Sequence, residues 1–157
     1  MNGTIIINNM SFALCEQLDK SKIICIKAKK AGFVMKIAAL AGRKDKLYWT
    51  KDPIVKYYDA PILWVQKPKY HRYCCHTTAF LYYNKAGLYK ITCQVFGHEI
   101  PVMGMYYGFA KTCKTKMGDP EVKENDIMIW DCEKLIVRCK HSKKRKEAWF
   151  SFVYKAD

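Results

Sequence analysis

The sequence has few acidic residues and no long apolar run. Its 157 residues include 14 acidic side chains against 28 basic ones, for a formal charge of +14 at pH 7. A transmembrane helix needs roughly 18 or more consecutive apolar residues. Lys or Asp interrupts every candidate stretch well before that length, as Lys36 does within residues 33–41. The sequence therefore excludes a transmembrane helix.

The N-terminal residues also do not fit the pattern expected of a secretory signal. The first nine residues carry no basic side chain and only three consecutive apolar residues, whereas a signal peptide needs a basic start and a longer apolar segment. Hydrophobic residues make up 50% of the chain and charged residues 27%, a balance typical of folded proteins rather than disordered ones. We therefore expect one compact basic domain over residues 1–157, located in the cytoplasm or the nucleus.

The eight cysteines lack the spacing of a structural zinc site. Such sites pair two Cys about two to four residues apart and follow them with a second pair of ligands. His71, Cys74, Cys75 and His76 lie within six residues, and whether they bind a metal stays open. A chain of this size does not need disulfides, so we interpret most of the cysteines as reduced thiols packed in the core. No cofactor is expected.

Motifs for catalysis are also scarce. A nucleophilic Cys–His pair would have to combine Cys74 or Cys75 with His98 or His141, and nothing in the sequence brings these residues together. A glycine-rich phosphate loop is absent. A small nuclease or protease that uses a histidine is therefore the least favoured class.

Strand patterns dominate what is present. Residues 88–96 alternate apolar and polar side chains, with Tyr89, Ile91, Cys93 and Val95 on the apolar side, which is the period of a half-buried strand. The β-branched and aromatic residues before them and the turn formers at 84–87 predict a hairpin over 77–96. Three further strand-like runs predict an antiparallel three-stranded meander over 127–154.

Helical patterns are fewer. Ser11 is expected to cap a short helix that reaches about residue 19, and residues 33–41 predict either a second helix or a strand. The short apolar run 23–26 is compatible with a buried strand. Prolines favour a loop or a sheet edge for 51–69, and residues 101–109 are interpreted as an apolar strand or a packed loop. The expected fold is α+β, predominantly antiparallel β, with one or two short helices.

Charge is distributed unevenly along the chain. Residues 20–90 are basic, residues 119–133 are mostly acidic and are expected to form a solvated loop, and residues 140–146 carry a dense positive cluster. This cluster is expected to connect the last two strands, so its cations would protrude and neutralise phosphates. Strand alternation places either Trp149 and Val153 or the set Phe150, Phe152 and Tyr154 in the core. The candidate nucleic-acid-binding residues here are Lys140, Lys143, Lys144, Arg145 and Lys146.

A second stretch combines cations with aromatic rings. It contributes the candidate nucleic-acid-binding residues Lys67, Lys69, Tyr70 and Arg72. Rings beside ammonium and guanidinium groups suit single-stranded nucleic acid, because stacking on a ring tolerates any base. For each ring, packing in the core is the competing interpretation.

These observations favour a non-enzymatic protein that binds RNA or single-stranded nucleic acid. The alternative is a matrix-like or viral accessory or assembly protein that docks on an anionic membrane or an acidic protein partner. Lysine far exceeds arginine, and Ile, Tyr and Asn are frequent, a bias typical of an AT-rich coding sequence. Composition does not separate the two classes, and the oligomeric state is not encoded in any pattern found.

Overall fold

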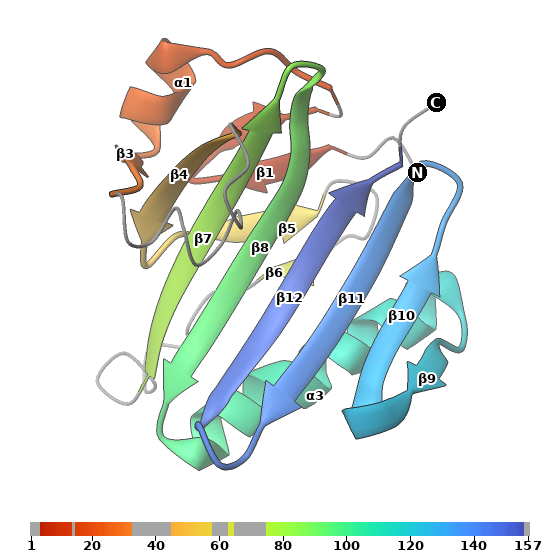
Figure 1. The fold of residues 1–157 in the computed structure, drawn as a ribbon. Helices are drawn as coiled ribbons and strands as arrows, with labels where there is room; N and C mark the ends of the chain where they lie inside the picture. Colours follow the sequence, from red (N-terminus) through yellow and green to blue (C-terminus); the bar gives the residue numbers. More distant parts are fainter. Residues whose placement is uncertain (1–3, 14, 33–44, 58–62, 65–74, 156–157) are drawn as a thin grey trace.

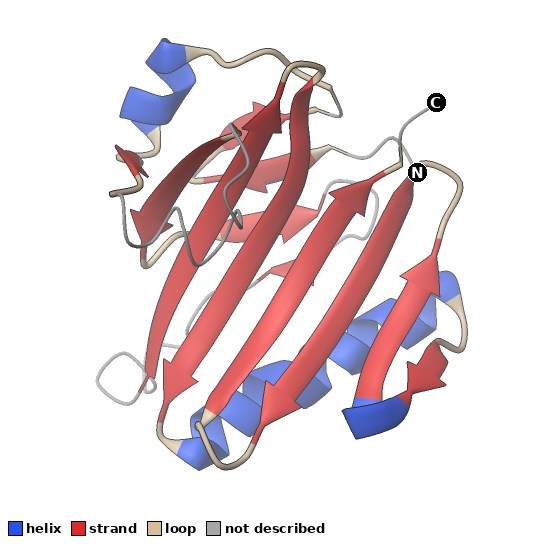
Figure 2. Ribbon diagram, in the orientation of Figure 1, coloured by secondary structure: helices blue, strands red, loops and turns tan. Residues whose placement is uncertain are grey.

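The computed structural model describes residues 4–13, 15–32, 45–57, 63–64 and 75–155. Within them the chain forms two antiparallel sheets and two α-helices, together with one turn of 3-10 helix (Figure 2). The predicted α+β class with mainly antiparallel strands is confirmed. The predicted helix or strand at 33–41 lies outside the described residues.

The large sheet has eight strands. In spatial order they are β3 (Lys29–Lys30), β4 (Lys46–Lys51), β7 (Cys75–Asn84), β8 (Gly87–Gly97), β12 (Glu147–Tyr154), β11 (Leu135–Ser142), β10 (Ile127–Asp131) and β9 (Glu121–Lys123). The predicted hairpin is β7–β8, and the predicted meander is β10–β11–β12. Pairing of β8 with β12 joins these two units into one sheet.

One face of the large sheet is covered. Helix α3 (Glu99–Met117) packs on it together with a small sheet of β2 (Met10–Phe12), β1 (Ile5–Ile7), β5 (Val55–Tyr57) and β6 (Leu63–Trp64), and both lie behind the large sheet in Figure 1. The ring of Phe109 on α3 lies 4.4 Å from the ring of Phe150 on β12, centroid to centroid. The main core therefore sits between the large sheet and these two covering layers, and a smaller buried cluster of Ala31, Leu47 and Tyr82 lies on the opposite face of the sheet.

Strand β12 directs its large apolar side chains into this core. Phe150, Phe152 and Tyr154 are buried, which leaves Trp149 and Val153 on the opposite face because side chains alternate along a strand. Of the two orientations that the sequence allows, the structure adopts the one that buries the larger apolar surface. Burial of this kind is the main favourable contribution to folding.

A bulge corrects the expected pattern of β8. Ile91, Cys93 and Val95 are fully buried as predicted, but Tyr89 is not part of that row. Tyr82 pairs with Lys90 and the next residue of β7 pairs with Leu88, so Tyr89 is an extra residue on its strand. A bulge of this kind shifts the alternation by one position, and Tyr89 packs against Tyr82 with ring centroids 6.1 Å apart.

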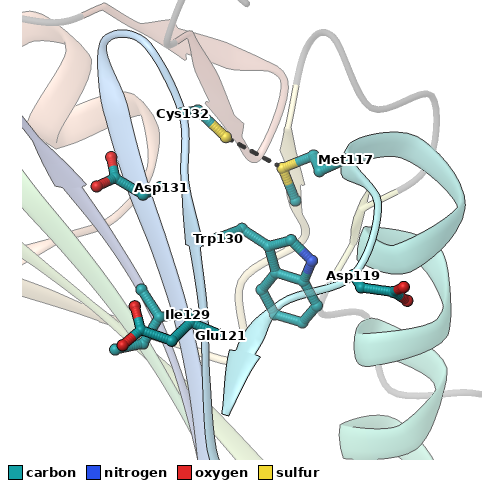
Figure 3. A pocket seen from close by; sticks show the side chains of 7 residues that line it. All are labelled: Met117, Asp119, Glu121, Ile129, Trp130, Asp131 and Cys132. Atoms are coloured by element: carbon teal, nitrogen blue, oxygen red, sulfur yellow. Dashed lines mark hydrogen bonds between the residues drawn. The ribbon is translucent and has the colours of Figure 1, made fainter. Parts of the chain in front are cut away.

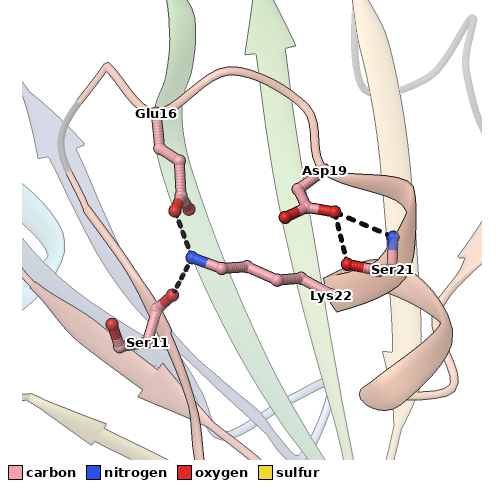
Figure 4. Close-up of polar contacts among 5 residues, drawn as sticks. All are labelled: Ser11, Glu16, Asp19, Ser21 and Lys22. Carbon is pink, nitrogen blue, oxygen red and sulfur yellow. Dashed lines mark hydrogen bonds and ion pairs between the residues drawn. The ribbon is translucent and has the colours of Figure 1, made fainter.

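The N-terminal helix begins later than predicted. Ser11 lies in β2, which pairs with β1, and helix α1 spans Lys20–Cys25, so the strand considered for 23–26 is wrong too. The N-cap of α1 is Asp19, whose Oδ1 accepts hydrogen bonds from the backbone N of Ser21 at 2.9 Å and from its Oγ at 2.6 Å (Figure 4). The Ser21 side-chain bond is the main reason that the pKa of Asp19 is lowered. Lys22 donates to the carbonyl oxygen of Ser11 and pairs with Glu16, which ties α1 to β2.

Helix α3 is the largest departure from the sequence expectation. Residues 101–109 lie within this 19-residue helix rather than in a strand or loop, and the helix is not short. Pro101 sits in the first turn, where a backbone N–H has no partner within the helix. Ile100 and Tyr107 are 85% and 56% exposed. Because apolar residues thus occur on the exposed side of the helix as well as on the buried side, the helical period of the hydrophobic pattern is obscured in the sequence. Within the described segments, no helix is both long and apolar enough to cross a membrane.

The acidic segment is structured too. The solvated loop expected over 119–133 consists instead of β9, a 3-10 turn (Glu124–Asp126) and β10, which form one edge of the large sheet. Most of its acidic side chains are exposed. The acidic side chains therefore contact solvent as expected. The expected loop is wrong, because β10 is a strand that pairs with β11.

Candidate nucleic-acid interface

The face of the large sheet turned away from α3 and the small sheet is called the open face below. In Figure 1 it is turned to the viewer, and none of the described helices or strands crosses in front of it. Its central side chains are Phe80 and Tyr82 on β7, Lys90, Thr92, Gln94 and Phe96 on β8, Glu147, Trp149, Ser151 and Val153 on β12, and Ile136, Arg138 and Lys140 on β11. The open face thus combines rings, cations and hydroxyl groups.

Strand register fixes which of these side chains are neighbours. Gln94, Trp149 and Lys140 lie side by side on three successive strands, and Thr92, Ser151 and Arg138 form the next row. Residues directly opposite each other on paired strands have Cβ atoms about 4.5–5.5 Å apart. A row of three side chains is therefore about as long as one or two nucleotides. The two rows lie side by side and form a continuous surface.

Cations lie over aromatic rings at three places on the open face. The Nζ atom of Lys90 is 5.0 Å from the ring centroid of Tyr82, and that of Lys140 is 5.8 Å from the ring of Trp149. Near the other end of the sheet, Lys29 lies 5.9 Å from the ring of Trp49. Each contact contributes about 0.5–1 kcal/mol at an exposed position. The Lys140 and Lys29 contacts each place a positive charge beside a partly exposed ring, whereas the ring of Tyr82 is buried against Ala31 and Leu47.

The centre of the open face is positively charged. On β11, Lys140 and Arg138 lie opposite Trp149 and Ser151 of β12, and on β8 Lys90 lies opposite Val153 of β12. Burial lowers the pKa of Lys90, and the positive charges of Arg138 and Lys140 lower it further. These cations repel one another in the free protein, so an anionic ligand would relieve that repulsion.

The basic tip is the turn Lys143–Lys146 between β11 and β12. All of its side chains are exposed. The turn is anchored, because Ser142 Oγ accepts a hydrogen bond from the backbone N of Arg145 at 3.2 Å and the Lys146 carbonyl accepts one from Gly97 N at 3.1 Å. The connection is shorter than predicted, since β11 continues through Ser142. Lys140 is therefore a strand residue beside Trp149.

A cavity of about 280 Å³ lies at this end of the open face. It is lined by Lys140, His141, Ser142, Arg145, Glu147 and Trp149. The Glu147 side chain is only 15% exposed, and its carboxylate lies 3.8 Å from the Arg145 guanidinium and 3.3 Å from Gln94 Nε2. Two of the candidate residues, Lys140 and Arg145, thus line one concave site.

The candidates from the second basic stretch lie outside the described residues. They are Lys67, Lys69, Tyr70 and Arg72. His71 and Cys74, from the group considered for metal binding, lie outside as well. Cys75 is fully buried in the core and His76 is exposed on the opposite face, where its ring lies 5.4 Å from that of Phe96. These two side chains therefore do not converge, and the described residues hold no group of three or more metal-ligating side chains.

A second cavity, of about 220 Å³, lies at the acidic edge of the sheet (Figure 3). Its lining includes Asp119, Glu121 and Asp131, together with Trp130. The indole of Trp130 donates a hydrogen bond to the Gly118 carbonyl at 2.9 Å. Carboxylates repel phosphates, so this cavity does not suit a nucleic acid.

Sequence patterns missed several residues of the open face. Arg138 and Lys90 occupy polar positions of predicted strands, but alternation alone does not show that their two strands belong to one sheet. For Trp49 and Phe80, no sequence pattern distinguishes a ring on the surface from a ring in the core. Compared with known proteins, the chain matches no protein family, no curated protein and no solved structure.

Proposed function

We propose that the protein is a non-enzymatic binding protein that holds RNA or another single-stranded nucleic acid on its open face. The observation that carries this proposal is the set of cations interleaved with rings on adjacent strands, centred on Lys90, Arg138, Lys140 and Trp149. Cations neutralise phosphates and release counterions, while exposed rings stack on bases. A cytoplasmic or nuclear location is part of the same proposal.

A single strand fits this surface better than a duplex does. Stacking on a protein ring requires an unpaired base whose face is accessible. The rings on the open face stand on a sheet, and the partly exposed hydroxyl group of Ser151 lies between them, 3.4 Å from the buried hydroxyl of Thr92. Hydroxyl groups donate and accept hydrogen bonds, so they complement bases and ribose alike.

Three of the buried cysteines are not suited to act as nucleophiles. Burial raises the pKa of Cys93 to about 12 and that of Cys139 to about 11, and it raises the pKa of Cys113 further. A thiol is nucleophilic only as its thiolate. These three cysteines therefore remain protonated at neutral pH and serve as core residues.

The experiment is a salt titration of RNA binding with matched variants. Fluorescence anisotropy of a labelled single-stranded RNA gives the affinity between low and moderate salt. Each phosphate contact contributes about −0.7 to the slope of log affinity against log salt. Replacing Lys143, Lys144 and Lys146 with Gln is expected to flatten the slope by about 2.

The control removes the same charge from α3. Lys111, Lys114 and Lys116 are exposed on the helix that covers the other face, and their replacement with Gln should change the slope by less. Equal effects of the two triple variants would contradict binding at the open face. Failure to bind RNA, combined with salt-sensitive flotation on anionic liposomes, would support the membrane-docking alternative instead.

A further inference from the structure

We propose that the cavity at the basic tip recognises one guanine base of the bound strand, with Trp149 as the stacking surface and Glu147 as the group that reads the base edge. The inference rests on the proposed function and adds a sequence preference to it. Both side chains line the same cavity, together with Lys140, Ser142 and Arg145.

The size of the cavity fits a single nucleotide. Its volume of about 280 Å³ lies near the lower limit of about 300 Å³ for small-molecule sites. The lining comes from the end of β11, the turn and the start of β12. A strand that crosses the open face can therefore place one base here, while its other nucleotides follow the rows of the sheet.

Trp149 and Lys140 provide a stacking surface with a phosphate ligand beside it. They are directly opposite each other on paired strands, and the Lys140 ammonium lies 5.8 Å from the indole centroid. A base that stacks on the indole takes the place of this cation–π contact. The long Lys140 side chain can then turn to the adjacent phosphate, since its ammonium is a mobile point charge on a flexible stem.

Glu147 is the unexpected residue in this basic site. A carboxylate weakens binding of a generic polyanion, because it repels phosphate. Its 3.8 Å separation from Arg145, whose side chain is 77% exposed, makes an ion pair that contributes little to stability. The carboxylate also accepts from Gln94 at 3.3 Å, and it has acceptor positions for about four hydrogen bonds. Glu147 is therefore available to accept hydrogen bonds from a ligand.

Guanine is the base that complements a carboxylate. Its Watson–Crick edge carries two adjacent donors, N1–H and the N2 amino group, which match the two oxygens of a carboxylate. On that edge, adenine and cytosine each place an acceptor beside their amino group, and uracil places carbonyl groups on both sides of its single N–H. An acceptor-only side chain such as Glu147 thus favours guanine over the other three bases.

The test compares two short RNAs, oligo(U) and the same oligomer with one central guanosine, by fluorescence anisotropy. A bidentate contact to a base corresponds to roughly 5- to 150-fold discrimination, so the wild-type protein should bind the guanosine oligomer more tightly by a factor in that range. Glu147→Gln should remove most of this preference, and it should bind oligo(U) more tightly than the wild type does because the carboxylate that repels phosphate is gone. Glu133→Gln, which neutralises an exposed carboxylate in the turn before β11, should retain the preference.

Inosine sharpens the result, because it keeps N1–H and lacks the N2 amino group. An oligomer with inosine in place of guanosine should bind with intermediate affinity. Equal affinity of the wild type for the oligo(U) and guanosine oligomers, or an unchanged preference in Glu147→Gln, would overturn the inference and leave the proposed function standing. Failure of the wild type to bind either oligomer would overturn both.

Discussion

Two tryptophans of the same meander face opposite sides of the sheet. Trp130 on β10 points to the covered face, is 3% exposed and uses its indole N–H to bond the Gly118 carbonyl at the end of α3. Trp149 on β12 points to the open face, where Lys140 lies over its ring. Each lines a cavity, one acidic and one mainly basic. The face of the sheet to which the side chain points, rather than residue type, thus separates a structural indole from a candidate binding indole.

Replacing Trp130 should have the largest effect, and the effect should be on stability. Trp130→Ala leaves a cavity and removes the hydrogen bond to Gly118, and substitutions of this kind cost about 3–5 kcal/mol. Urea denaturation measures the loss. The folded fraction should bind single-stranded RNA with unchanged affinity. A stable Trp130→Ala protein with weakened RNA binding would reverse the assignment of the two indoles.

Replacing Trp149 should affect RNA binding more than it affects the free energy of unfolding. Trp149→Ala should weaken single-strand binding by about 1–3 kcal/mol, the loss typical of a stacking ring, and this loss should depend little on salt. The unfolding free energy should change less than in Trp130→Ala, because Trp149 is only half-buried. Anisotropy and urea denaturation of both variants test the comparison. An unaffected RNA affinity would remove Trp149 from the interface.

Arg138 tests the charge of the open face separately from its rings. Arg138→Gln should reduce the slope of log affinity against log salt by about 0.7 for a single strand, the contribution of one phosphate. Lys114→Gln on α3 is the matched control and should leave the slope unchanged. A slope that responds equally to both substitutions would indicate general charge attraction without a defined face.

The smallest effect concerns the titration of Lys90. Its pKa is lowered by burial and then by Arg138 and Lys140, so the folded state binds this proton less tightly than the unfolded chain does. The cost to stability is fully present below the folded pKa, where the lysine is protonated in both states, and it is lost as the pH rises from the folded pKa to the higher unfolded pKa. A bound polyanion favours the charged form, so the pKa should rise on RNA binding. NMR titration of labelled lysine side chains measures the shift, and a further fall would contradict contact with phosphate.

Elements with a clear local signal could be predicted from the sequence. The β7–β8 hairpin has a two-residue period and turn-forming residues between its strands, and the C-terminal meander has the same features. Helix α3 was missed because exposed apolar residues such as Ile100 and Tyr107 hide its period. The displacement of Tyr89 was missed because a bulge depends on the partner strand.

The candidate site was only partly predictable for a similar reason. The tip residues from Lys143 to Lys146 form a dense cluster that is visible in the sequence. Lys90 and Arg138 lie 48 positions apart in the sequence, and they become near neighbours only because β12 pairs with both β8 and β11. Alternation tells which side chains share a face of one strand, but it does not tell which strands lie side by side.

The most direct test of the account is an NMR map of the surface that contacts single-stranded RNA. Side-chain and amide shifts should change on the open face, at Lys90, Arg138, Lys140 and Trp149, and at the basic tip. Shifts of Lys111 and Lys114 on α3 should stay constant. Changes centred on α3, or no changes at saturating RNA, would contradict the claim that the open face binds nucleic acid.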